Sequence, residues 1–186
     1  MGGVMLAVTL GGDLRTESGD GAMLARLAVA EAAFEAFCAG FDPGLLTASE
    51  ASVVLPRLSV FKRRVESVEG VTARRVDVSS VWKHRGFRSS AEWMAATTGD
   101  AVGVTSGLLA AARQLESLPA TAEAFAAGAV SLQAAREIAG AVGVDPTAEA
   151  GLLAVAAKGD HRGLVDSAAR VRQAARSAED ETAKHA

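Results

Sequence analysis

The sequence predicts an all-α protein: a multi-helix bundle with an N-terminal helical hairpin and a helix-turn-helix-like pair of helices. Apolar residues recur every three or four positions along most of the chain, which is the spacing of one helix face. No stretch alternates between apolar and polar residues as a half-buried strand does. Glycine and proline divide the chain into helix-length segments. With 186 residues, 49% of them hydrophobic, the chain can bury its own core without disulfides.

The first predicted helix runs from about Ala22 to Cys38 and has one apolar side. Five residues at spacings of four and three form that side: Met23, Leu27, Ala30, Phe34 and Phe37. The helix is expected to end at residues 40–44, where two glycines flank Phe-Asp-Pro.

The second predicted helix starts at Thr47 or Ser49 and continues to Val78, because Thr47 and Glu50 have the spacing of a capping box. Pro56 either kinks this helix or marks its true start. Its apolar residues lie close to a heptad seam, at Val54, Leu58, Phe61, Val65 and Val68. Because a short loop joins two helices with matching stripes, we expect an antiparallel hairpin.

Six further helices are predicted, at about residues 90–97, 100–118, 119–127, 132–142, 146–157 and 160–178. Ser89 and Glu92 form a second capping-box spacing at the first of them. Gly103 and Gly107 lie one turn apart, which predicts a tight helix–helix crossing. Four large residues on apolar stripes are expected to share one core: Trp93, Leu115, Phe125 and Ile138.

The middle of the chain has the outline of a helix-turn-helix. Pro119 suits the first position of a short helix, Gly128 can adopt the left-handed conformation that ends it, and Ser131 can cap the next helix. Two helices joined by a short turn containing glycine fit this motif. Many such pairs serve only as packing units, so the outline alone does not establish DNA binding.

The predicted domain organisation has three parts. Residues 1–20 are rich in glycine, lack periodicity and are expected to be mostly disordered. Residues 21–178 form a single helical domain, with the long hairpin at 21–80 and a compact bundle at 81–178. Residues 179–186 are a polar tail.

Charge is distributed unevenly along the chain. The net charge is −3 and the isoelectric point is about 5.7, yet residues 57–88 contain nine cations and three acids. An excess of +6 in one region can mark a surface that binds polyanions. The helix-turn-helix region is different, because residues 101–157 contain two cations and five acids. A domain that reads DNA bases is typically basic, so phosphate contacts are expected to outweigh base reading.

The sequence contains little that suggests catalysis. It has three histidines, one cysteine, no asparagine and no tyrosine, and no histidine lies near another ligand at metal-binding spacing. No glycine-rich phosphate-binding motif is present. We therefore predict no enzyme activity, no cofactor, and no catalytic or metal-binding residue. Cys38 is expected to be a buried structural thiol.

The same composition predicts a location. A single cysteine favours a reducing compartment, and the apolar run near the N-terminus is too short to span a bilayer. We therefore expect a cytoplasmic protein without membrane contact. Tryptophans near lysine and arginine at residues 82–93 can stack on nucleic-acid bases, although anchoring a bend between helices is the favoured interpretation.

Two motifs resemble the actinobacterial family called domain of unknown function 222 (DUF222), or the 13E12-repeat family. One is A-R-x-L-x-x-L-P, A-x-x-A-G-x-V-S and A-R-x-I-A, which begin at Ala112, Ala124 and Ala135; the other is G-F-R-S-S-A-E-W-M-A, from Gly86 to Ala95. The resemblance covers roughly residues 45–186. It implies a helical domain that is often followed by an HNH-type endonuclease. Because this chain stops before such a domain, we expect a nuclease-associated module without its nuclease.

Three functions remain open from the sequence. The first is association with double-stranded DNA, mainly through phosphates, with candidate contacts at Arg64, Arg75, Lys83, Arg85, Arg88, Gln133 and Arg136. The second is a protein-interaction or oligomerisation module, including a homodimer through the long N-terminal helices. The third is a truncated remnant without independent activity.

Overall fold

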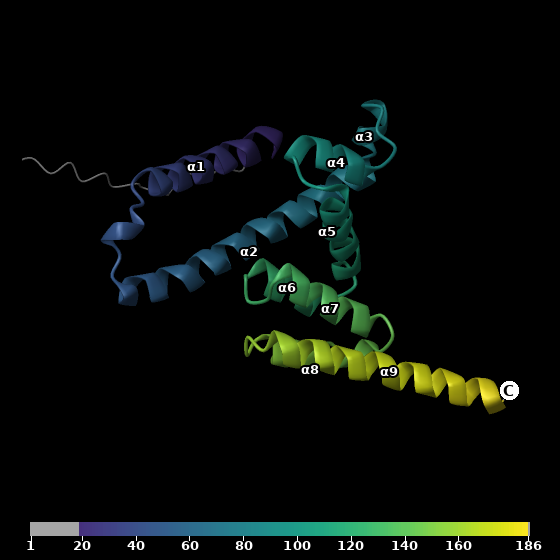
Figure 1. The fold of residues 1–186 in the computed structure, drawn as a ribbon. Helices are drawn as coiled ribbons and strands as arrows, with labels where there is room; N and C mark the ends of the chain where they lie inside the picture. Colours follow the sequence, from purple (N-terminus) through teal and green to yellow (C-terminus); the bar gives the residue numbers. More distant parts are fainter. Residues whose placement is uncertain (1–18, 186) are drawn as a thin grey trace, which may run out of the picture. The chain divides into compact units, whose positions relative to one another are not determined.

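The computed structural model describes the backbone of residues 19–185 and the side chains of residues 21–177. Every regular element in that range is helical (Figure 1), so the all-α prediction is confirmed. The elements are α1 (Gly19–Ala39), η1 (Pro43–Leu45), α2 (Ala48–Ser79), α3 (Val81–His84), α4 (Ser90–Thr98), α5 (Val102–Leu115), α6 (Pro119–Ala126), α7 (Leu132–Val142), η2 (Pro146–Ala148), α8 (Glu149–Ala156) and α9 (His161–His185).

The predictions for the two chain ends are only partly covered. The predicted disorder of residues 1–20 falls outside the described residues, apart from Gly19 and Asp20, which begin α1. At the other end, α9 continues to His185, so most of the predicted polar tail is helical. Ala186 lies outside the described residues.

The chain divides into two compact units, Met1–Ala51 and Ser52–Ala186, and the boundary falls near the start of α2. The first unit holds α1 and η1, and the second holds nearly all of α2 and the remaining helices. Each unit is described by itself below. The hairpin at 21–80 and the bundle at 81–178 stay predictions.

The first unit presents apolar side chains on its surface. Met23 and Leu24 are 66% and 69% exposed. The rings of Phe34, Phe37 and Phe41 follow one another, with centroids 6.0 Å and 5.5 Å apart. Cys38 is exposed, so its predicted burial is wrong. The reason is that no described element of its own unit covers this end of α1.

Most predicted helix starts agree with the structure. Glu50 N–H donates to Thr47 Oγ1 (3.2 Å) and Thr47 N–H donates to Glu50 Oε2 (2.8 Å), which completes the predicted capping box. Ser89 and Ser131 cap α4 and α7 as expected. Pro56 lies inside α2, so it does not mark the start of that helix.

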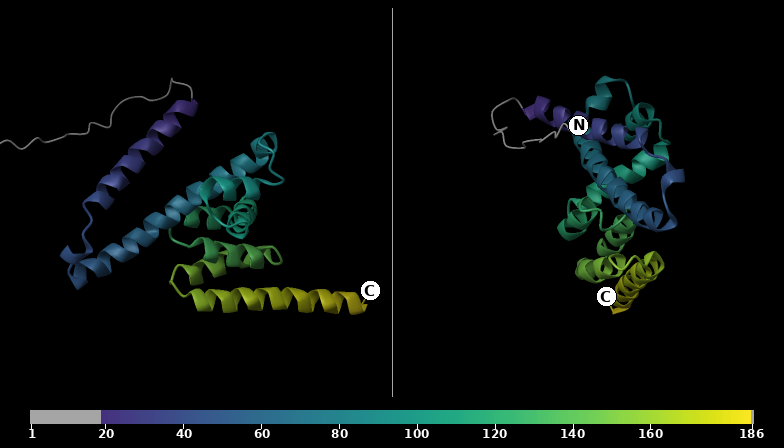
Figure 2. Two further views of the ribbon diagram at one scale, coloured as in Figure 1. Left: turned by 45° about the horizontal axis from the view of Figure 1, so that its top comes forward. Right: turned by 90° about the vertical axis from the view of Figure 1, so that its left-hand side faces the viewer.

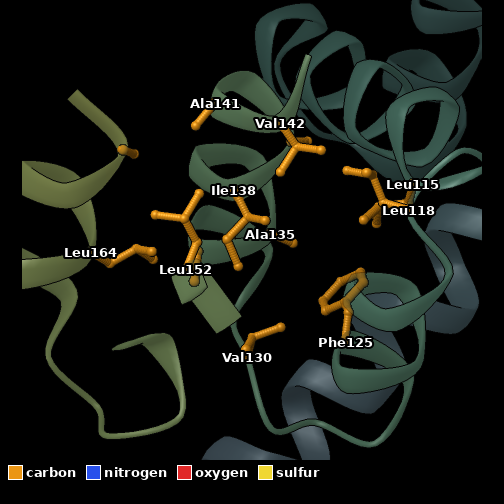
Figure 3. Close-up of a cluster of buried hydrophobic side chains, with 13 residues drawn as sticks. Leu115, Leu118, Phe125, Val130, Ala135, Ile138, Ala141, Val142, Leu152 and Leu164 are labelled. Atoms are coloured by element: carbon orange, nitrogen blue, oxygen red, sulfur yellow. The ribbon is translucent and has the colours of Figure 1, made fainter. Parts of the chain in front are cut away.

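Helix α7 forms the centre of the second unit. It packs against α5, α6, α8 and α9. Figure 2 shows that α8 and α9 both lie on one side of α7. Ala135 and Ile138 are fully buried, and Leu164 of α9 and Leu152 of α8 close over them (Figure 3). Phe125 and Leu115 complete this core from α6 and α5. The predicted clustering of Leu115, Phe125 and Ile138 is therefore confirmed.

Trp93 does not join that core, so this part of the prediction is wrong. It is half-buried against a smaller cluster formed by Ala73, Ala91, Met94, Leu108 and Leu109. Helix α4 packs on α5, and Leu132 of α7 contacts both clusters. A helical stripe identifies a residue that faces inward, but it does not tell which of two adjacent clusters the residue enters.

The predicted tight helix–helix crossing at the glycines of α5 is not observed. A Cβ at Gly107 would lie 3.2 Å from Nη1 of Arg136, whereas nothing lies within 4 Å of one at Gly103. The neighbour at Gly107 is therefore a flexible guanidinium rather than another backbone. Gly99 has a φ of +82° and closes α4.

Candidate nucleic-acid interface

The turn between α6 and α7 is fixed by its glycine. Gly128 has a φ of +75°, which residues with a side chain rarely adopt. A Cβ at this position would also lie 2.8 Å from the carbonyl oxygen of Val60 in α2. Gly128 therefore satisfies two separate requirements: the left-handed turn predicted from the sequence and the close approach of α2.

Two arginines of α2 bind this turn. Arg63 Nη1 donates to the carbonyl oxygen of Gly128 (3.1 Å), and Arg64 Nε donates to that of Ala127 (3.1 Å). These carbonyls lie at and just beyond the end of α6, where the helix dipole favours positive charge. Arg64, a predicted phosphate ligand, is exposed but already donates a hydrogen bond within the domain. Its role in DNA binding stays a prediction.

The start of α6 is bound by an acid from α8. Glu149 Oε1 accepts hydrogen bonds from the Thr121 backbone N–H (2.9 Å) and from Thr121 Oγ1 (2.7 Å). Thr121 is fully buried, so this carboxylate satisfies two polar groups that water cannot reach. Both ends of α6 are thus held by charged side chains from other helices.

Asp77 organises a second polar cluster near the end of α2. Its Oδ2 accepts from Arg74 Nη1 (2.9 Å) and Arg113 Nη2 (2.8 Å), and its Oδ1 accepts from Ser90 Oγ (2.6 Å). Burial alone would raise the pKa of Asp77, but the bonds from Ser90, Arg113 and Arg74 outweigh it and lower the pKa below its ordinary value. The cluster joins α2 to α4 and α5.

Arg74 also pairs with a second acid. Its Nε donates to Glu116 Oε1 at 2.7 Å. This hydrogen bond is the main reason why the pKa of Glu116 is lowered. Arg74 is therefore bound on two sides and is not available as a phosphate ligand in this arrangement.

Gln133 and Arg136, the predicted base-reading residues, lie together in an open groove of about 890 Å³. Side chains of α2, α5 and α9 also line the groove, including Glu66, Gln114 and Arg172. Arg172 Nη1 lies 3.5 Å from Glu137 Oε2, so one wall of the groove carries an ion pair. The groove thus brings the two predicted base-reading residues together among acidic as well as basic side chains.

This setting gives little support to base reading by α7. A recognition helix has to enter the major groove of DNA, which is about 12 Å wide. The side chains that α7 would use instead form the wall of a concave surface between α2, α5 and α9. The helix-turn-helix outline is present in the order of elements, and a role in base reading stays a prediction.

The remaining residues predicted to contact DNA lie near the C-terminal end of α2 and in the segment that follows it. Arg75, Lys83, Arg85 and Arg88, which we call the cationic end, are all exposed. Residues 74–92 contain five cations and two acids, a net charge of +3. Arg88 Nε lies 3.5 Å from Glu92 Oε1, whereas the structure gives no ion pair for the other three within residues 21–177. The cationic end thus groups three exposed cations of the predicted basic region for which the described residues supply no ion pair.

The aromatic residues beside the cationic end have structural contacts. Trp82 Nε1 donates to the carbonyl oxygen of Asp77 (3.4 Å), and the Lys83 ammonium lies 5.2 Å from the centroid of the Trp82 ring. Trp93 is half-buried against the smaller cluster. These contacts agree with the favoured interpretation, in which the tryptophans anchor the bend between helices.

Sequence reasoning missed that Arg63, Arg64 and Asp77 organise the domain. Their partners are 65, 63 and 36 positions away in the chain, respectively, and two of these partners are backbone carbonyls. Spacing rules operate over one or two helix turns, so they do not find such pairs. The only signal was Gly128, which marked the turn whose carbonyls need partners.

Two further observations concern the described residues alone. Within residues 21–177, no three or more His, Cys, Asp or Glu side chains gather closely enough to hold a metal ion. In the same part of the chain no helix has the length and apolar character required to cross a bilayer. The absence of enzyme activity and a cytoplasmic location stay predictions.

The fold and the polar clusters define an all-α domain built around the buried helix α7, in which the short helix α6 is held at both ends by charged side chains of other helices. Residues 52–184 match the family model described as Domain of unknown function (DUF222). The chain therefore belongs to the DUF222 family, as the two sequence motifs predicted, and the match covers nearly all of the second unit. No curated protein and no solved structure matches the chain.

Proposed function

We propose that this DUF222 domain is a non-catalytic module that associates with double-stranded DNA through phosphate contacts made by the cationic end. The observation that carries the proposal is the exposure of Arg75, Lys83 and Arg85 without an ion-pair partner in the described residues. Cations that already pair with acids contribute little to DNA binding, because breaking the pair offsets the new contact. Arg75, Lys83 and Arg85 have no such ion pair to break.

The proposal narrows the set of candidate contacts. Arg64 binds the end of α6, and Gln133 and Arg136 lie in a groove with acidic side chains. The mode of binding that these positions favour is therefore independent of base sequence, because phosphates carry no sequence information. A module of this kind would place an associated enzyme, such as an HNH nuclease, on DNA without choosing the cleavage site.

Salt dependence provides the test. If the four residues of the cationic end each neutralise one phosphate, log K falls against log salt with a slope of about −3 to −4. Fluorescence anisotropy with two labelled duplexes of unrelated sequence, in about 50–200 mM salt, measures that slope. We expect equal affinity for both duplexes.

A matched pair of double variants locates the surface. Arg75→Glu with Arg85→Glu should weaken binding to both duplexes equally and reduce the slope by about 2. Lys158→Glu with Arg162→Glu changes the net charge of the protein by the same amount at exposed positions of the second unit outside the cationic end. This control should bind nearly as the native chain does. Absence of salt-sensitive binding at about 50 mM salt, or equal loss in both double variants, would contradict the proposal.

A second candidate function is a protein-interaction module. The observation that favours it is the exposed apolar surface of α1, where Met23, Leu24 and Val29 are 66–71% exposed. Apolar surface of this kind marks an interaction site more often than an ordinary solvent face. The two functions are compatible, because they use different residues.

A further inference from the structure

Helix α1 lacks a solvent-facing side. Between residues 21 and 39 it has three charged side chains, Arg26, Glu31 and Glu35, and the rest are apolar or small. A helix that is apolar all round is normally buried. In the structure its large residues are exposed instead, with Leu27 at 52% and Phe37 at 46%.

The first unit exposes a series of large apolar side chains. The large side chains involved are Met23, Leu24, Leu27, Val29, Phe37, Phe41 and Leu45, each 40–79% exposed. Neighbouring exposed apolar side chains of this kind mark an interaction surface more often than single scattered ones do.

The pattern along α1 identifies the geometry of the partner. Apolar residues of α1 follow one another at spacings of four, three, four and three: Met23, Leu27, Ala30, Phe34 and Phe37. These are successive d and a positions of a heptad, in which Arg26 occupies g and Glu31 occupies the following e. In a parallel pair of helices in register, g of one chain lies beside the next e of its partner.

Charge complementarity then favours a second copy of this chain in the parallel orientation. Arg26 of each copy would lie beside Glu31 of the other, which gives two symmetric ion pairs. An antiparallel register with Leu27 opposite Phe37 instead brings Glu31 of one copy beside Glu31 of the other. Both side chains are exposed, and the structure gives no ion pair for either one within residues 21–177.

We propose that two copies of this chain associate through α1 as a parallel two-stranded coiled coil, with Arg26–Glu31 pairs between the copies fixing orientation and register. The interface is isologous, as in most homodimers. It uses no residue of the cationic end, so it extends beyond DNA association. A dimer joins two cationic ends in one particle, which raises the apparent affinity for a long duplex without any new contact.

Charge exchange tests the proposal on the full chain. Sedimentation or light scattering should give twice the chain mass of 18.9 kDa for the native protein. Arg26→Glu and Glu31→Arg should each raise the dimer Kd at least about tenfold, because each places like charges together twice. The double variant, which carries both changes, should restore dimerisation. Both substitutions are at exposed positions, and circular dichroism checks that the helices are retained.

Mixing the two single variants separates this interface from every intramolecular arrangement. A chain with Arg26→Glu should pair with a chain that carries Glu31→Arg, because both ion pairs form in the mixed dimer and neither forms in the homodimers. Energy transfer between N-terminally labelled copies measures this preference. Glu35→Arg is the matched control: it makes the same charge change at position b, which lies away from the partner, and should leave the Kd unchanged.

Two outcomes would overturn the proposal. One is a native chain that stays monomeric at about 100 µM, well above the Kd of a micromolar dimer. In that case the α1 seam is covered within the chain, as in the hairpin predicted from the sequence. The other is a dimer whose single variants show no preference for each other, which would place the interface elsewhere.

Discussion

The guanidinium of Arg64 donates from Nε to the carbonyl oxygen of Ala127, 3.1 Å away, across 63 positions of sequence. Arg63 makes the corresponding bond to the next carbonyl, that of Gly128. Two adjacent cations of the longest helix therefore stabilise the end of a short helix in the middle of the chain. Basic residues that suggest DNA binding in the sequence have a structural role here, and this role can be measured.

Replacing Arg64 by Met should destabilise the domain by up to about 1 kcal/mol, because the Ala127 carbonyl loses its charged donor while the apolar stem is kept. Urea denaturation followed by circular dichroism measures the change. Arg57→Met removes a cation of α2 for which no described bond exists, and it should leave the free energy of unfolding unchanged. Equal effects of the two substitutions would show that only net charge is involved.

Gly128→Ala should be the most damaging glycine substitution in the second unit. The residue must keep a positive φ and its Cβ would meet the Val60 carbonyl at 2.8 Å, so we expect a loss of about 2–4 kcal/mol. Gly99→Ala is the matched control: φ is +82° there, but nothing lies within 4 Å of the new Cβ. It should cost only about 1 kcal/mol. The same loss in both variants would mean that α2 moves aside at no cost.

Much of the fold follows from local rules. Thr47, Ser89 and Ser131 each begin a helix with the predicted capping bond, since a side-chain oxygen two or three residues before a free N–H has few alternatives. Gly128 adopts the predicted left-handed turn because glycine has no Cβ to oppose a positive φ. These features depend on residues within one turn of each other, so the sequence contains the information needed to find them.

Features that depend on packing between distant segments were harder to predict. Trp93 lies on an apolar stripe like Ile138, but it contacts the smaller cluster because α4 and α7 pack on different parts of α5. The Asp77 cluster unites α2, α4 and α5, and nothing in the spacing of Asp77, Ser90 and Arg113 reveals it. For the candidate interface, the sequence identified which residues are basic but not which of them are engaged within the domain.

The two apolar clusters predict different costs for two large-to-small substitutions. Ile138 is fully buried in the main core, so Ile138→Ala should cost about 3–5 kcal/mol through lost burial and a residual cavity. Trp93 is half-buried, and Trp93→Ala should cost less, about 1–3 kcal/mol, although the side chain is larger. Thermal and urea unfolding measure both. A larger loss for Trp93 would show that the ring is more enclosed than this structure has it.

The purified chain should not cut DNA. It has no asparagine, and its histidines lie at positions 84, 161 and 185, which are far apart in the sequence. An HNH-type site uses histidine and asparagine side chains to hold a metal ion and activate water. Incubation with supercoiled plasmid and Mg²⁺ or Mn²⁺ should leave the plasmid intact. Nicking that persists in repurified protein, at constant activity per mass, would contradict this expectation.

The Asp77 cluster predicts a loss of stability in acid. Because hydrogen bonds from Ser90, Arg113 and Arg74 lower the pKa of Asp77 in the folded state, its unfolded value of about 3.9 is the higher of the two. The charged form therefore stabilises the fold above about pH 4, and this contribution is lost as the pH falls through the lower, folded-state pKa. Glu116, whose pKa is also lowered, acts in the same direction.

Asp77→Asn should accordingly destabilise the domain at pH 7, by roughly 1–3 kcal/mol, since two arginines lose their shared carboxylate. Below about pH 4 the difference between the variant and the native chain should shrink, because Asp77 of the native chain becomes protonated as well. Urea midpoints measured from pH 7 down to pH 3 give both curves. Asp166→Asn, at an exposed position of α9, is the control and should follow the native curve throughout. A gap between Asp77→Asn and the native chain that stays constant with pH would show that the carboxylate charge does not hold α2, α4 and α5 together.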